Sequence, residues 1–239
     1  MICEYSFDVV MKELEEKYFS TCFKHMNEPS KEAYELNAKI YDGMYKHLLP
    51  KDKNCEILDV GCGMGHFLYY ISKKGYKNFY GIDISKEQVD ICKRYVTENI
   101  ELIDTFIFLK ERKEKYDLIV ANDFIEHITL EQALEFVKLC FNALKENGQL
   151  IIKTPNMSAP FSNSVLYVDL THRHGYTEHN LGQLLRFGSF EDVSFYPITY
   201  HPIRRMIGFF IKFLYKLFSL PPPSVVTHTI IGVGKKATK

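Results

Sequence analysis

The sequence predicts an α/β domain in which a mostly parallel sheet carries helices on both faces. Two observations support this fold class. Short apolar runs alternate repeatedly with stretches of helical periodicity, and three alternating glycines stand where the first run meets its helix. The chain has 239 residues, 46% of them hydrophobic, which is enough to bury the core of one such domain. We therefore expect residues 1–239 to form a single domain.

The elements follow in order along the chain. Residues 1–50 have apolar positions at helical spacing and end at Pro50, which predicts a helical cap. Short apolar or β-branched runs predict strands at 56–60, 79–82, 118–121, 150–153 and 227–233. Helical spacing predicts helices at 67–74, 86–98, 130–144, 178–187 and 202–220.

Charge and cysteine content restrict the partners. Thirty Lys and Arg residues balance thirty Asp and Glu residues, so no overall positive field attracts a nucleic acid, and we expect no nucleic-acid partner. The N-terminus lacks the pattern of a signal peptide. No C-x-x-C pair is present, which predicts reduced thiols and a cytoplasmic location for Cys3, Cys22, Cys55, Cys62, Cys92 and Cys140.

The clearest functional signal lies at the end of the first predicted strand, in the string Asp59-Val60-Gly61-Cys62-Gly63-Met64-Gly65. Glycines there let the backbone turn sharply and approach a ligand beside the N–H groups of a helix N-terminus. Asp83 ends the second predicted strand, where a carboxylate in this topology accepts hydrogen bonds from ribose hydroxyls. The pattern predicts a nucleoside ligand that also carries a charged group.

A dinucleotide fingerprint, G-x-G-x-x-G, needs glycine where this chain has His66. The string instead resembles motif I of the class I S-adenosylmethionine-dependent methyltransferases, D-x-G-x-G-x-G. Three later segments extend the resemblance, at 80–85, 116–123 and 144–152. The resemblance implies a Rossmann-like, doubly wound, mostly parallel seven-stranded sheet. It also implies S-adenosyl-L-methionine as cofactor and S-adenosyl-L-homocysteine as product.

By the same resemblance, residues 51–155 form the cofactor-binding half and residues 156–239 the acceptor-binding half. The backbone from Gly61 through Cys62 and Gly63 to Gly65, following Asp59, would hold the methionine part of the cofactor.

The remaining cofactor contacts implied by the resemblance come from the ends of later strands. Asp83 would hold the ribose and Ile84 would cover one face of the adenine. Asp104 would read the adenine amino group, with a solvated loop carboxylate as the alternative. Asn122 and Asp123 would line the pocket with their backbone, at the edge where open α/β sheets bind ligands.

Candidate catalytic residues gather in the polar segment 169–177. Asp169 with His172 or His174 predicts an oriented base for a hydroxyl acceptor, and Arg173 predicts a clamp for a phosphate or carboxylate. Tyr176 joins them as an acceptor contact. The alternative is that these side chains hydrogen-bond one another and hold an irregular loop together.

Two further residues lie outside this segment. His127 follows the fourth predicted strand and is a second catalytic candidate, with a structural or cofactor-loop role as the alternative. Asn156, just beyond the fifth predicted strand, is a candidate acceptor contact. We predict no metal site, because too few ligands are visible in the sequence.

The segment 169–177, with the apolar residues that follow it, resembles the methyltransferases of bacterial capsule and O-antigen polysaccharide clusters. This resemblance implies O-methylation of a sugar, a sugar nucleotide or a phosphoramidate precursor. Three alternatives stay open: a methyltransferase acting on another small metabolite, a catalytically silent cofactor-binding module, and an NAD-dependent oxidoreductase.

The predicted helix 202–220 is apolar over most of its girth and carries Arg205, Lys212 and Lys216. Such a helix has to bury its apolar surface. We expect it to pack on its own domain or on a second subunit, with peripheral contact to the inner face of a membrane as the alternative.

Overall fold

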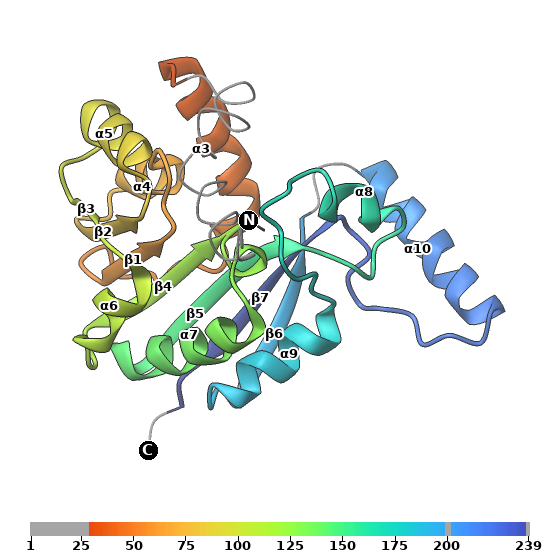
Figure 1. Cartoon of the computed structure of the whole chain (residues 1–239). Coiled ribbons are helices and arrows are strands. Elements are labelled where there is room, and N and C mark those ends of the chain that lie inside the picture. Colours follow the sequence, from red (N-terminus) through yellow and green to blue (C-terminus); the bar gives the residue numbers. More distant parts are fainter. Residues whose placement is uncertain (1–28, 199–201, 238–239) are drawn as a thin grey trace, which may run out of the picture.

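A computed structural model of the chain describes residues 29–198 and 202–237. Its seven strands form one sheet in the order β3-β2-β1-β4-β5-β7-β6 (Figure 1). Strand β7 pairs antiparallel with β5 and with β6, and the other pairs are parallel, so the predicted mostly parallel seven-stranded sheet is confirmed. The strands are β1 (Glu56–Val60), β2 (Asn78–Asp83), β3 (Ile100–Leu102), β4 (Tyr116–Asn122), β5 (Leu144–Pro155), β6 (Asp192–Pro197) and β7 (Thr229–Lys235).

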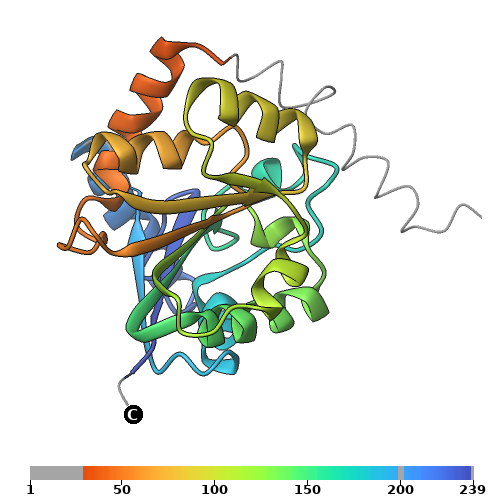
Figure 2. The same cartoon turned by 90° about the vertical axis from the view of Figure 1, so that its left-hand side faces the viewer.

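Helices cover both faces of the sheet (Figures 1 and 2). The helices are α3 (Lys31–Tyr45), α4 (His66–Lys73), α5 (Lys86–Tyr95), α6 (Thr105–Lys110), α7 (Leu130–Ala143), α8 (Ser162–Leu166), α9 (Glu178–Phe187) and α10 (Pro202–Leu217), with the 3-10 turn η2 (Ile125–His127). Successive side chains of each strand point to opposite faces of the sheet, so each strand contributes to two hydrophobic cores. Leu58 faces the core under α6, α7 and α9, whereas its neighbour Ile57 faces the core under α3, α4 and α5.

The predicted elements are present with small shifts at their ends. Helix α9 has the predicted bounds, and α5 ends at Tyr95 rather than at residue 98. The predicted cap 1–50 is helical over Lys31–Tyr45, while its first 28 residues lie outside the described part. The division into a cap, a cofactor half and an acceptor half stays a prediction.

Helix α10 stands away from the sheet, beyond its β6 and β7 edge (Figure 1). Its side chains from Met206 onward are mostly exposed, including Phe209 at 67% and Phe213 at 58%. One side of α10 contacts its own domain, where the Tyr215 hydroxyl donates to the Ser158 carbonyl at 3.0 Å, while the described residues leave its other, apolar side exposed. No helix in the described ranges is both long and apolar enough to cross a membrane.

Four cysteines lie in the described part, Cys55, Cys62, Cys92 and Cys140, and each is a buried free thiol, as predicted. Cys3 and Cys22 lie outside the described residues.

Candidate active site

The site lies at the carboxyl ends of β1 and β4, which are neighbours at the point where the strand order reverses. From β1 the sheet continues through β2 to β3 on one side, and through β4 to β5 on the other. Connections leave the two central strands in opposite directions there, which opens a crevice for a ligand.

The turn after β1 depends on glycine for two separate reasons. Gly61, Gly63 and Gly65 have φ angles of 63°, 54° and 81°, a left-handed region that favours glycine. A Cβ on Gly61 would lie 2.9 Å from Phe124 Cδ2, and one on Gly63 would lie 2.7 Å from Gln88 Oε1. The backbone of this turn therefore stays bare and open to close approach by a ligand.

Asp83 ties the end of β2 to this turn. Its Oδ2 accepts a hydrogen bond from the Gly63 N–H at 2.8 Å, and its Oδ1 accepts one from the Ser85 N–H at 2.8 Å. Burial raises the pKa of the Asp83 carboxyl. The next side chain, Ile84, is 60% exposed although it is apolar, which leaves a flat apolar surface beside the carboxylate. A nucleoside fits this pairing, with its ribose at Asp83 and its base against Ile84.

Asp59, the fourth of the five residues of β1, is 1% exposed, and neither carboxylate oxygen makes a hydrogen bond of normal geometry to the protein. Burial and the nearby charge of Asp83 raise the pKa of the Asp59 carboxyl well above its usual range, and the Asn122 amide opposes this rise. The Asn122 Nδ2 acts on this carboxylate without a hydrogen bond of normal geometry, and it too is buried. Such orphaned groups are costly unless a ligand satisfies them. The ammonium group of the cofactor's methionine part fits a carboxylate of this kind.

Helix α3 covers the glycine turn, which the sequence patterns did not reveal. The Tyr34 hydroxyl donates to the Met64 carbonyl at 2.8 Å, and the rings of Tyr34 and His66 lie 4.7 Å apart. Burial lowers the pKa of His66 to about 4, so this imidazole is neutral at physiological pH. A second tyrosine of α3, Tyr45, donates its hydroxyl to Asn122 Oδ1.

Two of the predicted cofactor residues make contacts of another kind. Asp104 is exposed and caps α6, because its Oδ1 accepts from the N–H groups of Phe106 and Ile107 at 2.9 and 3.0 Å. Its adenine contact stays a prediction. Asp123 has a positive φ of 49° and pairs through Oδ2 with the ammonium of Lys153.

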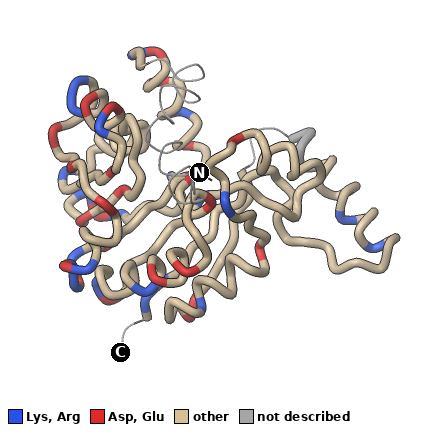
Figure 3. Tube along the Cα trace, viewed as in Figure 1, with Lys and Arg blue, Asp and Glu red and all other residues tan. Residues whose placement is uncertain are grey.

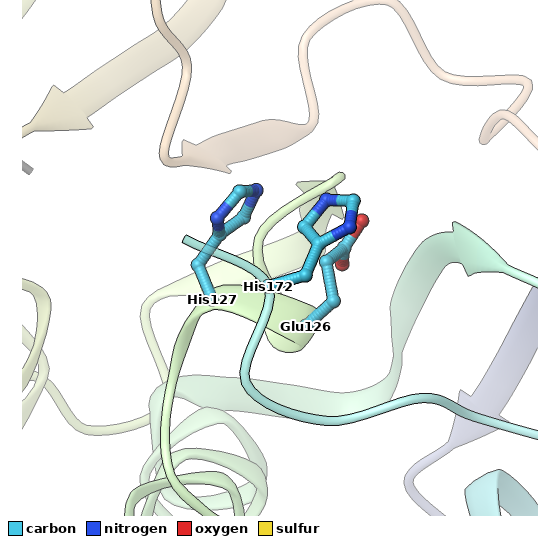
Figure 4. Close-up of side chains that lie close together, drawn as sticks. All are labelled: Glu126, His127 and His172. Carbon is cyan, nitrogen blue, oxygen red and sulfur yellow. The ribbon is translucent and has the colours of Figure 1, made fainter. Parts of the chain in front are cut away.

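A second group of polar side chains, the histidine cluster, consists of Glu126, His127 and His172. Glu126 and His127 lie on η2, directly after β4, and His172 comes from the loop after α8. One ligand atom from each of the three lies within 4.8 Å of the others, and Figure 4 shows the two imidazoles facing each other beside the carboxylate. Phe124, which precedes η2, packs against Gly61, so this loop touches the glycine turn.

Hydrogen bonds at Nδ1 orient both imidazoles. His172 Nδ1 lies 2.9 Å from the Leu166 carbonyl, which can only accept, so this nitrogen carries a hydrogen. His127 Nδ1 lies 2.8 Å from Thr171 Oγ1, and that hydroxyl donates to Asp169 Oδ1 at 2.7 Å. His127 therefore also donates from Nδ1. In the tautomer with the hydrogen on Nδ1, the basic lone pair of each ring is on Nε2.

Glu126 is the most buried member of the histidine cluster, at 1% exposure. Its Oε2 accepts from the Thr154 hydroxyl at 3.0 Å, while its Oε1 is buried without a hydrogen-bond partner. Burial, and then the charge of Asp123, raise the pKa of Glu126 to about 8. Burial and then His172 lower the pKa of His127 to about 4. The surroundings thus favour the neutral forms of Glu126 and His127.

The structure links several of the predicted catalytic residues. Asp169 is connected to His127 through the Thr171 hydroxyl, and its pairing with His172 or His174 stays a prediction. The ring of His174 packs on Tyr176, with centroids 4.9 Å apart. The N–H groups of Arg173 and His174 donate to the Glu126 carbonyl at 2.7 and 3.3 Å.

The two remaining candidates for acceptor binding are buried. Asn156 is fully buried, and its Nδ2 donates to the carbonyls of Val225 and Thr227 while its Oδ1 accepts from Ser158. The Asn156 amide thus holds the approach to β7, and its contact with the acceptor stays a prediction. Tyr176 is 1% exposed, and burial and then the charge of Glu126 raise the pKa of its hydroxyl.

Sequence reasoning missed Tyr34, Thr171 and the part that Glu126 plays. Glu126 and His127 stand next to each other directly after a predicted strand, which was the available signal. Thr171 gave no signal, since its contact with His127 joins residues 44 positions apart.

Comparison with known proteins places this geometry in a family. The model of a methyltransferase domain family matches residues 28–194, so the chain belongs to that family. In the solved structures, a methyltransferase from Archaeoglobus fulgidus described as dependent on S-adenosylmethionine has a TM-score of 0.68 and 22% identity. That match covers 92% of this chain and 99% of the other. The phosphoethanolamine N-methyltransferase 2 of Haemonchus contortus, bound to S-adenosylhomocysteine, has a TM-score of 0.60 and 12% identity, covering 85% and 53% of the two chains.

Two curated relatives match a shorter segment. The phosphoethanolamine N-methyltransferase of Plasmodium falciparum is 34% identical over 104 residues, which is 42% of this chain and 39% of that protein. A ubiquinone biosynthesis O-methyltransferase of Rickettsia bellii is 33% identical over 104 residues, 42% of each protein. The matches thus span about two fifths of these relatives.

The chain therefore carries a methyltransferase domain of this family, and its fold is that of proteins described as dependent on S-adenosyl-L-methionine. The Rossmann-like fold is confirmed, and the family sets aside an NAD-dependent oxidoreductase. The orphaned Asp59 carboxylate, the bare glycine turn and the Asp83 carboxylate beside exposed Ile84 fit the three parts of this cofactor.

Proposed function

We propose that this methyltransferase transfers its methyl group to an oxygen atom of a small acceptor bound at the histidine cluster. The observation that carries the proposal is the pair of imidazoles oriented through Nδ1, at the cofactor edge of the sheet. An alcohol oxygen has to lose its proton near the transition state, whereas an anionic oxygen does not. Two basic Nε2 atoms beside a carboxylate suit the first case.

The bound cofactor supplies a methyl group already activated on a sulfonium sulfur. The acceptor oxygen forms the new C–O bond as the S–CH₃ bond breaks, and the electron pair of that bond stays on sulfur. The hydroxyl proton leaves the oxygen at the histidine cluster. The protein contributes mainly by holding the oxygen in line with the sulfur–methyl bond.

For the acceptor we propose a sugar, a sugar nucleotide or a phosphoramidate precursor of a surface polysaccharide. The resemblance of segment 169–177 to capsule and O-antigen methyltransferases supports this class. Arg173 and His174, whose backbones are anchored on Glu126, supply cationic or polar groups suited to a phosphate. A cytoplasmic location agrees with the buried free thiols of the described cysteines.

A panel of sugar, sugar-nucleotide and phosphoramidate-nucleotide acceptors tests the proposal, with mass spectrometry for the gain of one methyl group and NMR for the atom that receives it. We expect O-methylation, and we expect His172→Gln to lower kcat at least tenfold while the Kd for S-adenosylhomocysteine stays unchanged. Methylation at nitrogen would contradict the proposal. Cofactor binding without turnover of any acceptor would indicate a silent binding module.

A further inference from the structure

We propose that Glu126, His127 and His172 form a binding site for a divalent metal ion. The three side chains converge from two segments of the chain, with one ligand atom of each within 4.8 Å of the others (Figure 4). Metal–ligand bonds of about 2.1 Å put neighbouring ligands of a tetrahedral ion about 3.4 Å apart. Small side-chain rotations therefore suffice to close the site around an ion.

An unsatisfied buried oxygen points independently to a ligand. Glu126 is 1% exposed, and its Oε1 is buried without a hydrogen-bond partner. Its other oxygen is held by the Thr154 hydroxyl at 3.0 Å, which keeps the carboxylate in place. A cation at the histidine cluster would satisfy Oε1 and offset the cost of burying it.

The surrounding hydrogen bonds have the pattern found behind metal-binding histidines. A ligating imidazole usually donates its other ring N–H to a carbonyl, a carboxylate or a similar acceptor, which orients the ring. His172 donates from Nδ1 to the Leu166 carbonyl, and His127 donates to Thr171, which is in turn bonded to Asp169. With Nδ1 of each ring donating a hydrogen bond, Nε2 is the nitrogen that would bind the metal.

The ligand types select the class of ion. Two imidazole nitrogens and one carboxylate oxygen suit Zn²⁺ or a similar first-row transition metal, whereas Ca²⁺ and Mg²⁺ prefer oxygen ligands. Three protein ligands leave an open position, as in catalytic sites. The sequence alone predicted no metal, because His172 lies 45 positions from His127 and the cluster is visible only in the fold.

This inference rests on the proposed function, and it names how the acceptor is activated. A hydroxyl that contacts the ion at the open position has a lowered pKa and releases its proton to water before it attacks the methyl group. The histidines then act as ligands and need not take the proton themselves.

Titration of the metal-free full-length protein with Co²⁺ and with Zn²⁺ tests the site directly, since Co²⁺ bound to imidazole gives a visible absorption spectrum. We expect one ion per chain, and at least a tenfold weaker Kd in each of Glu126→Gln, His127→Gln and His172→Gln. His179→Gln is the matched control, because His179 is an exposed histidine of α9 outside the histidine cluster. Circular dichroism checks that each variant is folded.

The outcomes separate this inference from the proposed function. Absence of binding by the wild type, or binding that the three substitutions leave unchanged, overturns the metal site. O-methylation that survives chelation unchanged also overturns it, while the proposed function stands. One ion per chain without O-methylation of any acceptor supports the site and overturns the proposed function.

We also infer, from a separate observation, that α10 docks on an anionic lipid surface. An exposed apolar stripe at helical spacing runs along this helix, formed by Met206, Phe210, Phe213 and Leu217, which are 58–71% exposed. The stripe points away from the domain, because the opposite side of α10 bonds back to it, through Tyr215 to the Ser158 carbonyl at 3.0 Å.

The charged residues of α10 indicate which kind of surface its apolar stripe binds. Helix α10 contains Arg204, Arg205, Lys212 and Lys216 and no Asp or Glu. Figure 3 shows Lys or Arg and no acidic residue along the drawn part of α10. An apolar face on a helix whose charged residues are all basic matches a surface of negatively charged lipids, each basic residue near that surface contributing about 1 kcal/mol.

Sedimentation with vesicles tests the docking, using phosphatidylcholine with and without phosphatidylglycerol. We expect binding to the anionic vesicles, loss of that binding in a Phe210→Ser, Phe213→Ser double variant, and about fivefold weaker binding in Lys216→Gln. The control is Ile107→Ser, which removes an exposed apolar residue of α6. Absence of vesicle binding overturns the inference, as does a dimer in light scattering that the double variant disrupts, since a second copy then covers the stripe.

Discussion

The glycine turn and the histidine cluster lie at the ends of neighbouring strands, yet they are built by different means. The turn is made by the backbone, through three left-handed glycines and the N–H that Gly63 donates to Asp83, all between residues 59 and 85. The histidine cluster is made by side chains from two segments, joined through Thr154, Thr171 and the Leu166 carbonyl.

Because they are built differently, we expect the glycine turn and the histidine cluster to have different roles. The turn binds the part of the reaction that the whole family shares, namely the cofactor, and its backbone tolerates little change. The histidine cluster lies where loops vary, and loops on a rigid scaffold commonly carry specificity. Changes in the turn should therefore abolish cofactor binding, whereas changes around the cluster should alter the rate with binding intact.

The largest effect is expected for Gly65→Ala. Gly65 has a φ of 81°, and a Cβ there would overlap Cys92 Sγ. The backbone strain is about 1–2 kcal/mol, and the overlap adds to it. We expect at least a tenfold loss of affinity for S-adenosylhomocysteine, measured by calorimetry.

Gly75→Ala is the matched control for this change. Gly75 has a similar φ of 83°, but nothing lies within 4 Å of its Cβ position. The same strain should lower the stability there and leave the affinity unchanged. Equal losses of affinity in both variants would mean that the turn has no special part in binding.

The second-largest effect is expected for Asp59→Asn, which should raise the stability of the protein at neutral pH but weaken its binding of S-adenosylhomocysteine. Burial raises the pKa of Asp59, so the folded protein loses stability as the pH rises above the ordinary Asp value of about 4. The neutral variant avoids this loss. Its melting temperature should match that of the wild type near pH 4 and exceed it increasingly toward pH 7.

The same substitution should weaken binding of S-adenosylhomocysteine about tenfold at pH 7, because the ammonium group loses its carboxylate partner. Thermal denaturation across the pH range, together with calorimetry, checks both parts. A variant that is less stable than the wild type at pH 7 would contradict the conclusion that the buried Asp59 carboxylate destabilises the folded protein at that pH.

Much of the fold was predictable, because β1, α4 and β4 have strong periodicity and the glycine turn has a recognisable pattern. Two strands and two short helices were missed, for physical reasons. Strand β3 has three residues, α8 has five, α6 has six, and β6 is a half-buried edge strand that ends at Pro197, so none shows a clear period. The two strands form by pairing with longer neighbours.

The site divides in the same way. Asp59, the glycines and Asp83 belong to one local pattern, and the structure brings them together as predicted. The partners of the histidines could not be predicted, since the Thr171 hydroxyl meets His127 through a loop of irregular structure. Asn156 follows a strand, which suggested a ligand contact, but nothing in the sequence indicated its hydrogen bonds to the Val225 and Thr227 carbonyls.

A smaller effect is expected for Thr171→Val, which keeps the shape of the side chain and removes the hydroxyl between His127 and Asp169. Loss of such an orienting partner commonly costs about 10-fold in rate. We expect kcat to fall about tenfold with an unchanged Kd for S-adenosylhomocysteine, and Thr171→Ser to restore it. A loss of cofactor affinity would remove the distinction between the two regions.

The smallest effect is expected for Asp104→Ala, which tests where the cofactor region ends. The Asp104 carboxylate caps α6, and losing such a cap costs about 1 kcal/mol of stability. Asp104→Asn should keep the cap, since an asparagine oxygen accepts the same two N–H groups. If capping is the whole role, calorimetry will give both variants the wild-type affinity for S-adenosylhomocysteine. If Asp104 also accepts a hydrogen bond from the adenine amino group, both variants bind S-adenosylhomocysteine more weakly, and the cofactor-binding region extends past β3.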